Sequence, residues 1–204
     1  METIKNLKSE IRKLERLVRT QSGEITRLSS LTDYDFLTGI YNRQGFIREA
    51  EKFFKEFKKT EQNERRAISF KNFSILFVDL DNLKVINDAY WHEAGDEAIK
   101  KAAEVFKGSL RDFDVVARWG GDEFILGLVG ADGREALHVA QKLKSQLNAV
   151  KVRGFALGAS FGVISAIHDG LKTKVLNLYE LIEKADTAMY EAKKNKGKGF
   201  IVAH

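Results

Sequence analysis

The chain has 204 residues, 44% of them hydrophobic, and no cysteine. The lack of cysteine excludes disulfides, thiolate metal sites and cysteine nucleophiles, while the length suits one ordinary domain with an appendage. The net charge is +5, but the basic excess lies at the two ends, so we do not expect nucleic-acid binding. No apolar run approaches the roughly 20 residues that span a bilayer, and we expect a soluble, cytoplasmic protein with no membrane contact through this chain.

The first thirty residues repeat hydrophobic side chains every seven positions. One seam position holds Ile4, Ile11, Val18 and Ile25, and the other holds Leu7, Leu14, Gln21 and Leu28. β-Branched residues at the first position with leucine at the second favour two parallel strands. Residues 1–31 are therefore predicted to form a parallel dimeric coiled coil, which Gln21 and Gly23 weaken. An amphipathic helix packed on its own domain is the alternative.

The heptad register breaks at Leu31 among capping and turn residues, so the second domain is placed at residues 32–204. Apolar periodicity there predicts helices at 44–59, 83–88, 95–108, 134–149 and 175–194, a loop at 60–66, and strands at 73–78, 115–118, 123–128, 155–165 and 200–203. Gly120 and Gly121 are expected to give the positive φ angles of a tight hairpin. The fold class is α+β: a palm-like, ferredoxin-related domain with a mainly antiparallel five-stranded sheet flanked by helices.

Two aspartates follow apolar strands in a pattern that suits catalysis. Asp79 ends one predicted strand and Asp122 begins another, so neighbouring strands could present both carboxylates at one end of the sheet. Two Mg²⁺ ions held there would activate a hydroxyl and stabilise a leaving oxygen in a displacement at phosphorus. Aspartates that only cap turns give the same pattern, so the pair alone leaves the function open.

An ordered set of motifs resembles the family of GGDEF diguanylate cyclases, over about residues 35–200. The motifs are Asp35 to Arg43, Val78 to Asp88, His92 with Gly95-Asp96, Val115 to Trp119, the signature Gly120-Gly121-Asp122-Glu123-Phe124, Ser160 to Val163, Ala185-Asp186, and Tyr190 to Lys193. The resemblance implies condensation of two GTP into cyclic di-GMP with release of two pyrophosphates. Because each domain of this family holds one GTP, it also implies a homodimer, which the coiled coil would support.

The resemblance implies a role for each site residue. The metal ligands would be Asp79, the carbonyl of Leu80, Asp122 and Glu123, with two Mg²⁺ per active site and Mn²⁺ as a substitute. Asp122 and Glu123 would be catalytic, with Glu123 as a further metal ligand or as the proton acceptor. The substrate would contact Asp81, Asn82, Leu83, Lys84, Asn87, His92, Asp96, Gly120, Gly121, Lys193 and Lys198. Within that set, Asn87 and Asp96 would read guanine, and the lysines would neutralise the triphosphate, although a solvent-facing Lys84 is an equal alternative.

Arg111 and Asp114 lie shortly before the signature and resemble the family's product-inhibition site. Guanidinium and carboxylate suit a phosphate and a guanine edge, whereas a surface salt bridge is the plainer interpretation. Two departures from the family pattern stand out: Trp91 replaces the usual glycine before the histidine, and Lys196-Gly197-Lys198 replaces the usual Gly-Arg-Asn.

Three other functions fit parts of the sequence. An inert domain could serve as a cyclic di-GMP receptor through Arg111 and Asp114, although intact Asp79, Asp122 and Glu123 argue against it. A coiled-coil scaffold whose head only binds partners would not need these polar residues together. An enzyme making a mixed dinucleotide is also conceivable, but Asp96 favours guanine. The sequence does not identify an input signal.

Overall fold

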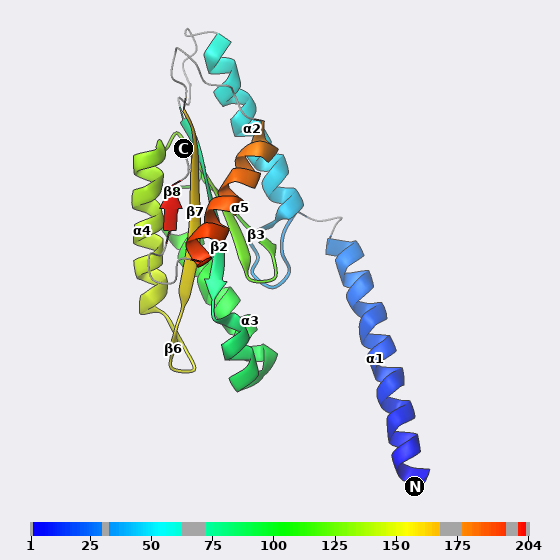
Figure 1. The fold of residues 1–204 in the computed structure, drawn as a ribbon. Coiled ribbons are helices and arrows are strands. Elements are labelled where there is room, and N and C mark those ends of the chain that lie inside the picture. Colours follow the sequence, from blue (N-terminus) through cyan, green and yellow to red (C-terminus); the bar gives the residue numbers. More distant parts are fainter. Residues whose placement is uncertain (1, 30–32, 63–71, 168–176, 195–199, 203–204) are drawn as a thin grey trace.

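A computed structural model describes residues 2–29, 33–62, 72–167, 177–194 and 200–202 (Figure 1). The helices are α1 (Glu2–Ser29), α2 (Arg43–Gln62), α3 (Leu83–Ser109), α4 (Gly133–Ala149) and α5 (Leu178–Lys194). The strands are β1 (Tyr41–Asn42), β2 (Asn72–Asp81), β3 (Val115–Gly120), β4 (Glu123–Val129), β5 (Lys151–Val152), β6 (Phe155–Ala156), β7 (Gly158–Ile167) and β8 (Phe200–Val202).

The main sheet has the order β1-β3-β4-β2-β7-β8. The pairs β3–β4, β4–β2 and β2–β7 are antiparallel, whereas β1–β3 and β7–β8 at the two edges are parallel. The order β2-α3-β3-β4-α4-β7 is the βαββαβ arrangement of ferredoxin-like folds. The predicted α+β class and its five strands are therefore confirmed, and the two-residue strand β1 is an addition at one edge.

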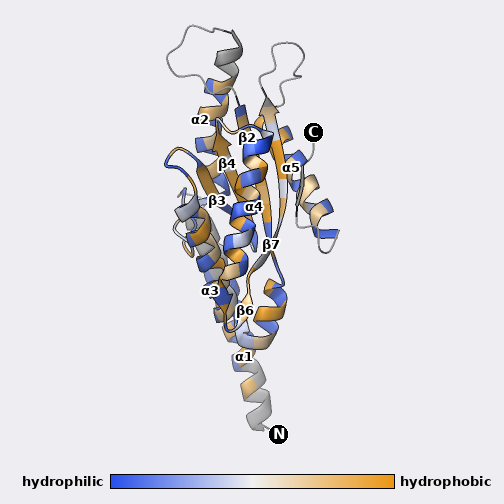
Figure 2. Cartoon of the chain, turned by 90° about the vertical axis from the view of Figure 1, so that its left-hand side faces the viewer, coloured by the Kyte–Doolittle hydropathy of each residue, from blue (hydrophilic) through white to orange (hydrophobic). Residues whose placement is uncertain are grey.

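Helices cover both faces of the sheet, and each face has its own hydrophobic core. Along β2 the side chains alternate: Leu76 and Val78 join the core under α3 and α4, while Ile75 and Phe77 join the core under α2 and α5. Figure 1 shows α4 on one side of the sheet and α2 with α5 on the other, and Figure 2 shows the strands coloured mainly as hydrophobic. A central strand buried on both faces was predicted at 73–78 and is confirmed.

Several predicted element boundaries differ from the structure. Strand β2 runs to Asp81, beyond the predicted 73–78, and α5 begins at Leu178, later than the predicted residue 175. Helix α2 continues to Gln62, so residues 60–62 belong to the helix and not to a loop; the rest of that predicted loop lies outside the described residues. The strand predicted at 155–165 is divided at Leu157, whose N–H donates to the Val150 carbonyl at 3.0 Å. Residues before this point turn back at Arg153-Gly154 and form the small hairpin β5–β6.

Helix α3 is broken where the sequence predicted two separate helices. Tyr90 and Trp91 have non-helical backbone angles, and Trp91 has φ 67° and ψ 171°. That combination lies in a region used almost only by glycine, which gives a physical reason for the glycine that the family usually has there. Trp91 keeps this backbone conformation and leaves its side chain 82% exposed.

Helix α1 stands apart from the sheet and its helices in Figure 1. The predicted seam residues Leu7, Ile11, Leu14 and Val18 are 49–60% exposed in the single chain. The predicted boundary at residues 31 and 32 lies outside the described residues. Across the part of the chain that the structure describes, no helix combines the length and apolar character needed to cross a membrane.

Candidate active site

Asp79 and Glu123 lie opposite each other on the antiparallel strands β2 and β4. Side chains along a strand point alternately to its two faces. Asp79 lies two residues after Phe77, and Glu123 lies two residues before Ile125. Because Phe77 and Ile125 both face α2 and α5, Asp79 and Glu123 are on that face of the sheet. Asp79 is only 5% exposed. Two carboxylates are therefore held side by side by the sheet register, without depending on a loop.

Lys193 of helix α5 lies directly against this pair. Its Nζ is 2.6 Å from Oδ1 of Asp79, and its side chain is 45% exposed. Gly162 of β7 sets the height of the helix above the sheet, because a Cβ atom there would overlap the backbone of Ala185 and Met189 on α5. This close approach brings Lys193 within ion-pair distance of Asp79.

The hairpin between β3 and β4 differs from the prediction in two details. Only Gly121 has a positive φ, 54°, whereas Gly120 is the last residue of β3. Asp122 lies in the turn, and β4 begins at Glu123. The carbonyl of Asp122 accepts the N–H of Leu80 at 3.1 Å, so the hairpin is fixed to the end of β2. Of the signature residues, Glu123 is the one directly opposite Asp79.

The carboxylates of this site favour a bound proton or cation. Burial raises the pKa of Asp79, and the charge of Asp122 adds to this, while the hydrogen bond from Lys193 opposes it. Burial also raises the pKa of Glu123, with further contributions from Asp186 and Asp79. Burial lowers the pKa of Lys193, but its contact with Asp79 and the surrounding carboxylates outweigh this and raise it. One ammonium group thus faces several carboxylates.

This donor set fits a divalent cation of the hard type. Among the described residues, no three histidine, aspartate or glutamate side chains are close enough together to form a complete metal cage. Magnesium does not need one, because it is commonly held by one or two carboxylates together with water and substrate phosphates. The site matches that requirement, because it offers two carboxylates with raised pKa values, only oxygen donors and a net negative local charge.

The predicted phosphate-binding loop follows β2. Asn82 has φ 62° and ψ 17° and provides no side-chain hydrogen bond to the start of α3, so backbone N–H groups at Leu83 and Lys84 are not capped by it. Lys84 is exposed. The carboxylate of Asp81 accepts from the Ser160 hydroxyl at 2.9 Å, a partner that the sequence did not suggest.

The two residues predicted to read guanine, Asn87 and Asp96, lie on either side of the break in α3, and His92 lies beside the break. The Oδ1 atom of Asn87 is buried and has no hydrogen-bond partner. It lies so close to Gly95 that a Cβ atom there would overlap it. His92 and Asp96 are exposed on the second half of the helix. The two halves of α3 thus bring Asn87 next to the residue before Asp96. The last predicted substrate contact, Lys198, lies outside the described residues.

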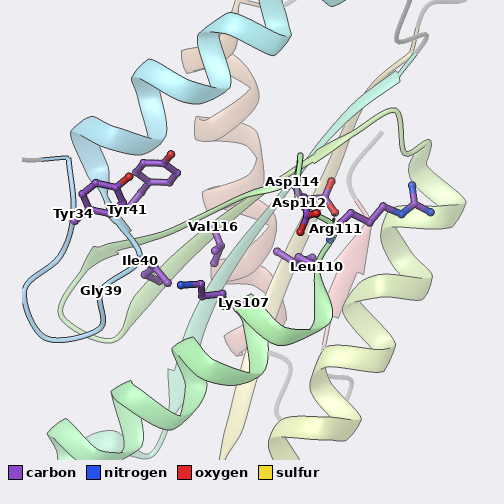
Figure 3. Close-up of a pocket in the computed structure, with 10 residues that line it drawn as sticks. All are labelled: Tyr34, Gly39, Ile40, Tyr41, Lys107, Leu110, Arg111, Asp112, Asp114 and Val116. Carbon is purple, nitrogen blue, oxygen red and sulfur yellow. Dashed lines mark hydrogen bonds between the residues drawn. The ribbon is translucent and has the colours of Figure 1, made fainter. Parts of the chain in front are cut away.

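Arg111 and Asp114 border a pocket of 320 Å³ on the other side of β3 (Figure 3). The pocket is lined by Tyr34, Gly39, Ile40, Tyr41, Lys107, Leu110, Arg111, Asp112, Asp114 and Val116. The Asp114 carboxylate accepts from the backbone N–H of Arg111 at 3.0 Å and of Val129 at 3.1 Å. Burial raises the pKa of Asp114 despite these bonds. The Arg111 guanidinium is exposed beside the Phe113 ring.

Sequence reasoning missed the role of Arg118. Its Nη1 is 3.3 Å from the Asp35 carboxylate, and its Nε and Nη2 donate to the Gly121 carbonyl at 3.0 and 2.8 Å. Arg118 therefore ties the turn at residues 33–39 to the hairpin. The motifs contained both residues, but the 83-residue separation between Arg118 and Asp35 gave no sign of the contact.

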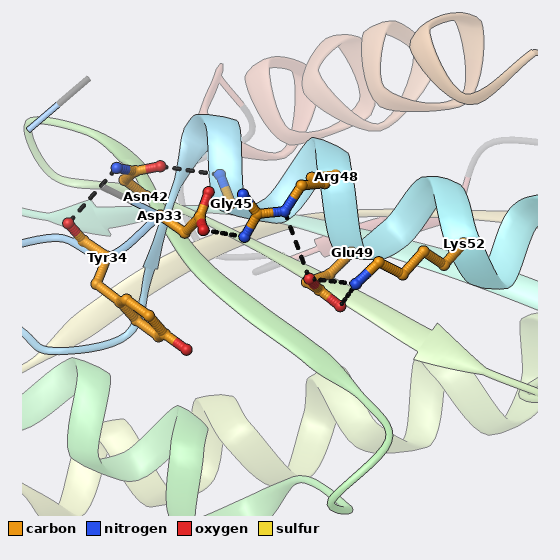
Figure 4. Close-up of polar contacts among 7 residues, drawn as sticks. All are labelled: Asp33, Tyr34, Asn42, Gly45, Arg48, Glu49 and Lys52. Carbon is orange, nitrogen blue, oxygen red and sulfur yellow. Dashed lines mark hydrogen bonds and ion pairs between the residues drawn. The ribbon is translucent and has the colours of Figure 1, made fainter. Parts of the chain in front are cut away.

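Polar contacts also fix the start of the domain to α2 (Figure 4). The Asp33 carboxylate pairs with Arg48, and the Asp33 carbonyl accepts the Asn42 N–H at 2.8 Å. The Asn42 side chain accepts from the Gly45 N–H at 2.9 Å. Glu49 accepts from Lys52 at 2.7 Å. The first described residues after α1 are thus held on the body of the domain.

Comparison with known proteins agrees with this geometry. The family described as "Diguanylate cyclase, GGDEF domain" matches residues 32–199. The chain is 32% identical over 178 residues to diguanylate cyclase DgcM of Escherichia coli K12, covering 87% of this chain and 40% of DgcM. It is 36% identical over 125 residues to diguanylate cyclase DosC of the same organism, covering 59% of this chain and 26% of DosC. The chain thus spans less than half the length of these curated relatives.

Solved structures show the same fold. The coiled coil and GGDEF domain of DgcB from Caulobacter crescentus, in complex with c-di-GMP, matches with a TM-score of 0.69 at 19% identity, covering 97% of this chain and 99% of that one. A microbial GGDEF domain described in its interaction with cyclic di-GMP matches with a TM-score of 0.65 at 31% identity. The match covers 84% of this chain and 99% of that one. Because the family match covers residues 32–199, this chain belongs to the GGDEF-domain family of diguanylate cyclases.

Proposed function

We propose that this chain condenses two molecules of GTP into cyclic di-GMP and releases two pyrophosphates. The observation that carries this proposal is the pairing of Asp79 with Glu123 across β2 and β4, with Lys193 2.6 Å from Asp79. Phosphoryl transfer needs little covalent chemistry from the protein, but it needs groups that position the reactants and balance charge. Two carboxylates on the sheet and one ammonium on the packed helix α5 supply such groups.

Asp79, Glu123, the carbonyl of Leu80 and Asp122 would hold the metal, with two Mg²⁺ per site and Mn²⁺ as a substitute. When bound, such ions make a ribose 3′-hydroxyl more acidic and offset negative charge on the reacting phosphate. The raised pKa values of Asp79 and Glu123, caused chiefly by burial and then by neighbouring carboxylates, support the assignment, because a bound cation, like a proton, offsets the negative charge of these buried groups.

Glu123 would accept the proton of the attacking 3′-hydroxyl. A carboxylate whose pKa is raised by burial and by its neighbours is a stronger base than an exposed one. Its direction of shift fits that task. Lys193 would move from Asp79 to the triphosphate once cations occupy the carboxylates, because its side chain is 45% exposed and its ammonium sits on a flexible stem.

The first half of α3 and the residues before it would bind GTP. The uncapped N–H groups at Leu83 and Lys84 suit phosphate oxygens. The unpartnered Oδ1 of Asn87 needs an N–H donor, and guanine carries N–H groups on the edge where adenine offers a different pattern. Asp96 would accept from the same edge, with His92 nearby. Asp81, Asn82, Gly120, Gly121 and Lys198 complete the proposed contacts.

A homodimer through α1 would bring two GTP-loaded domains together. The seam residues Leu7, Ile11, Leu14 and Val18 are about half exposed in one chain, and a second copy in register would cover them. Linking two domains raises their effective concentration. The coiled coil is therefore part of the proposed catalytic unit.

Cyclic di-GMP would also inhibit the enzyme at Arg111 and Asp114. These residues border a 320 Å³ pocket that also contains Lys107, so two cationic side chains are available for phosphates. Because the Asp114 carboxylate already accepts two backbone N–H groups, its ability to accept a further donor rests on its remaining lone pairs. A receptor function through this pocket alone would leave the Asp79–Glu123 pair without a role.

Incubation of the chain with GTP and Mg²⁺, followed by chromatographic identification of the products, tests this function. We expect cyclic di-GMP from the wild-type chain and strongly reduced product from an Asp122→Asn variant. Absence of cyclic di-GMP at chain concentrations that give the dimer would refute the proposal. Added cyclic di-GMP should slow the wild type more than an Arg111→Ala variant, and equal inhibition of both would refute the inhibitory site.

A further inference from the structure

Trp91 holds a backbone conformation that its side chain disfavours. Its angles of φ 67° and ψ 171° lie in a region that is essentially restricted to glycine, and a bulky residue there is strained. Such outliers persist when surrounding structure enforces them, and they concentrate at binding sites and active sites.

Packing within the chain does not compensate for this strain. The Trp91 side chain is 82% exposed, so burial of the indole contributes little to the fold. The neighbouring Tyr90 ring instead contacts Phe155 of the β5–β6 hairpin, with ring centroids 5.9 Å apart. That contact fixes the break in α3 and leaves the indole outside the domain.

The position of Trp91 along α3 points to a ligand. Asn87 lies shortly before the break in α3 and Gly95 shortly after it, and the two are in close contact. Trp91 therefore stands in the short connection between two segments that touch. Asn87 carries the buried Oδ1 without a partner. A flat ring with N–H donors on its edge would suit both Asn87 and the exposed indole.

We infer that Trp91 stacks on the guanine base of the GTP that Asn87 and Asp96 bind, as a substrate-binding residue that adds affinity at the active site. The inference rests on the proposed function. Stacking of a base on an exposed aromatic side chain is strong enough to offset the backbone strain at Trp91.

Fluorescence of a single tryptophan tests the contact directly. The sequence has two tryptophans, and Trp119→Phe leaves Trp91 as the reporter, while a ring is kept between Phe46 and Phe77. The probe is 3′-deoxy-GTP, which lacks the attacking hydroxyl and is not turned over. We expect saturable quenching of Trp91 emission, with the same midpoint as calorimetric binding. Binding without any change of Trp91 emission would overturn the inference.

Two substitutions separate stacking from a purely structural role. Trp91→Gly should raise the Tm by about 2 to 4 °C because it removes strain, yet weaken binding of 3′-deoxy-GTP about fivefold or more, which is about 1 kcal/mol at 1.4 kcal/mol per tenfold. Trp91→Phe should stay within about twofold of wild type because it keeps a flat ring. A Trp91→Gly variant that binds as tightly as wild type would refute stacking.

The proposed function fails separately from this inference. If the wild-type chain makes cyclic di-GMP and Trp91→Gly shows the same affinity, the inference alone is wrong. If calorimetry detects no binding of 3′-deoxy-GTP to the wild-type chain, both are wrong. If affinity falls and the Tm rises in Trp91→Gly, the inference is confirmed whatever the rate of turnover.

Discussion

Lys193 and Asp79 form an ion pair across the interface of helix α5 and strand β2, with Nζ 2.6 Å from Oδ1. They are 114 residues apart in the chain. The pair joins the carboxylate site to helix α5, and it makes the position of α5 relevant to the proposed catalysis.

Replacing Lys193 by methionine should lower turnover about tenfold or more, equivalent to about 1.4 kcal/mol of barrier, because it removes the ammonium while it keeps the stem. Since the lysine is 45% exposed, the loss of stability should be at most about 1 kcal/mol. Lys194→Met is the matched control, because Lys194 lies over the Tyr190 ring and not at Asp79. Steady-state rates and thermal unfolding measure both effects. Equal rates for the two variants would contradict a catalytic role for Lys193.

Gly162→Ala should destabilise the domain by about 1 to 3 kcal/mol, because the added methyl group overlaps the backbone of Ala185 and Met189. The substitution also lifts α5 from the sheet, so turnover should fall with the Lys193 contact. Gly108→Ala near the end of α3 is the control: its Cβ meets nothing within 4 Å, and alanine favours the helix by up to about 1 kcal/mol. Urea unfolding compares the two, and similar midpoints would show that the close approach at Gly162 is unimportant.

The buried strands β2 and β4 could be predicted from their apolar runs, and the strand ends correctly placed Asp79 and the signature hairpin at one end of the sheet. The sequence could not predict which signature residue faces Asp79, because that depends on the register between β2 and β4, which the apolar pattern does not fix. It also could not predict the Lys193 and Arg118 contacts, because both arise from tertiary packing between distant segments. The β5–β6 hairpin was missed because its strands have only two residues each, too short for a periodic signal.

The stability of the site should depend on pH and on Mg²⁺ together. Burial raises the pKa of Asp79 from 3.8 and that of Glu123 from 4.5, so the folded chain binds these protons more tightly than the unfolded chain. The two protonated groups stabilise the folded chain fully at pH values below their ordinary pKa values. This stabilisation is lost as pH rises through their raised pKa values in the folded chain. A cation competes with the protons, so Mg²⁺ should raise the Tm more at about pH 8 than at about pH 5.5.

Thermal unfolding with and without Mg²⁺ at the two pH values measures this effect. In an Asp79→Asn variant, the Tm increment from Mg²⁺ should differ much less between the two pH values, because the substitution removes the most buried carboxylate of the site. A Tm increment from Mg²⁺ that is the same at both pH values, or larger at low pH, would contradict the assignment of a cation to these carboxylates.

Leu14→Gln in α1 should weaken the homodimer, because Leu14 is a seam residue that is 57% exposed in the single chain. We expect a shift toward monomer in sedimentation and a steeper dependence of the rate per chain on concentration. Arg16→Gln, on the same helix but outside the seam, should leave both unchanged. If Leu14→Gln sediments and turns over as the wild type does, the coiled coil is not the dimer interface.

The most direct measurement is the ratio of pyrophosphate to cyclic di-GMP formed from GTP and Mg²⁺, in the wild type, in Glu123→Gln and in Glu183→Gln, whose side chain lies on the exposed face of α5. The proposed site predicts two pyrophosphates per cyclic di-GMP in the wild type and in Glu183→Gln, and a rate lower by about 10² or more in Glu123→Gln. A wild type that makes no cyclic di-GMP, or a Glu123→Gln variant as fast as Glu183→Gln, would contradict it.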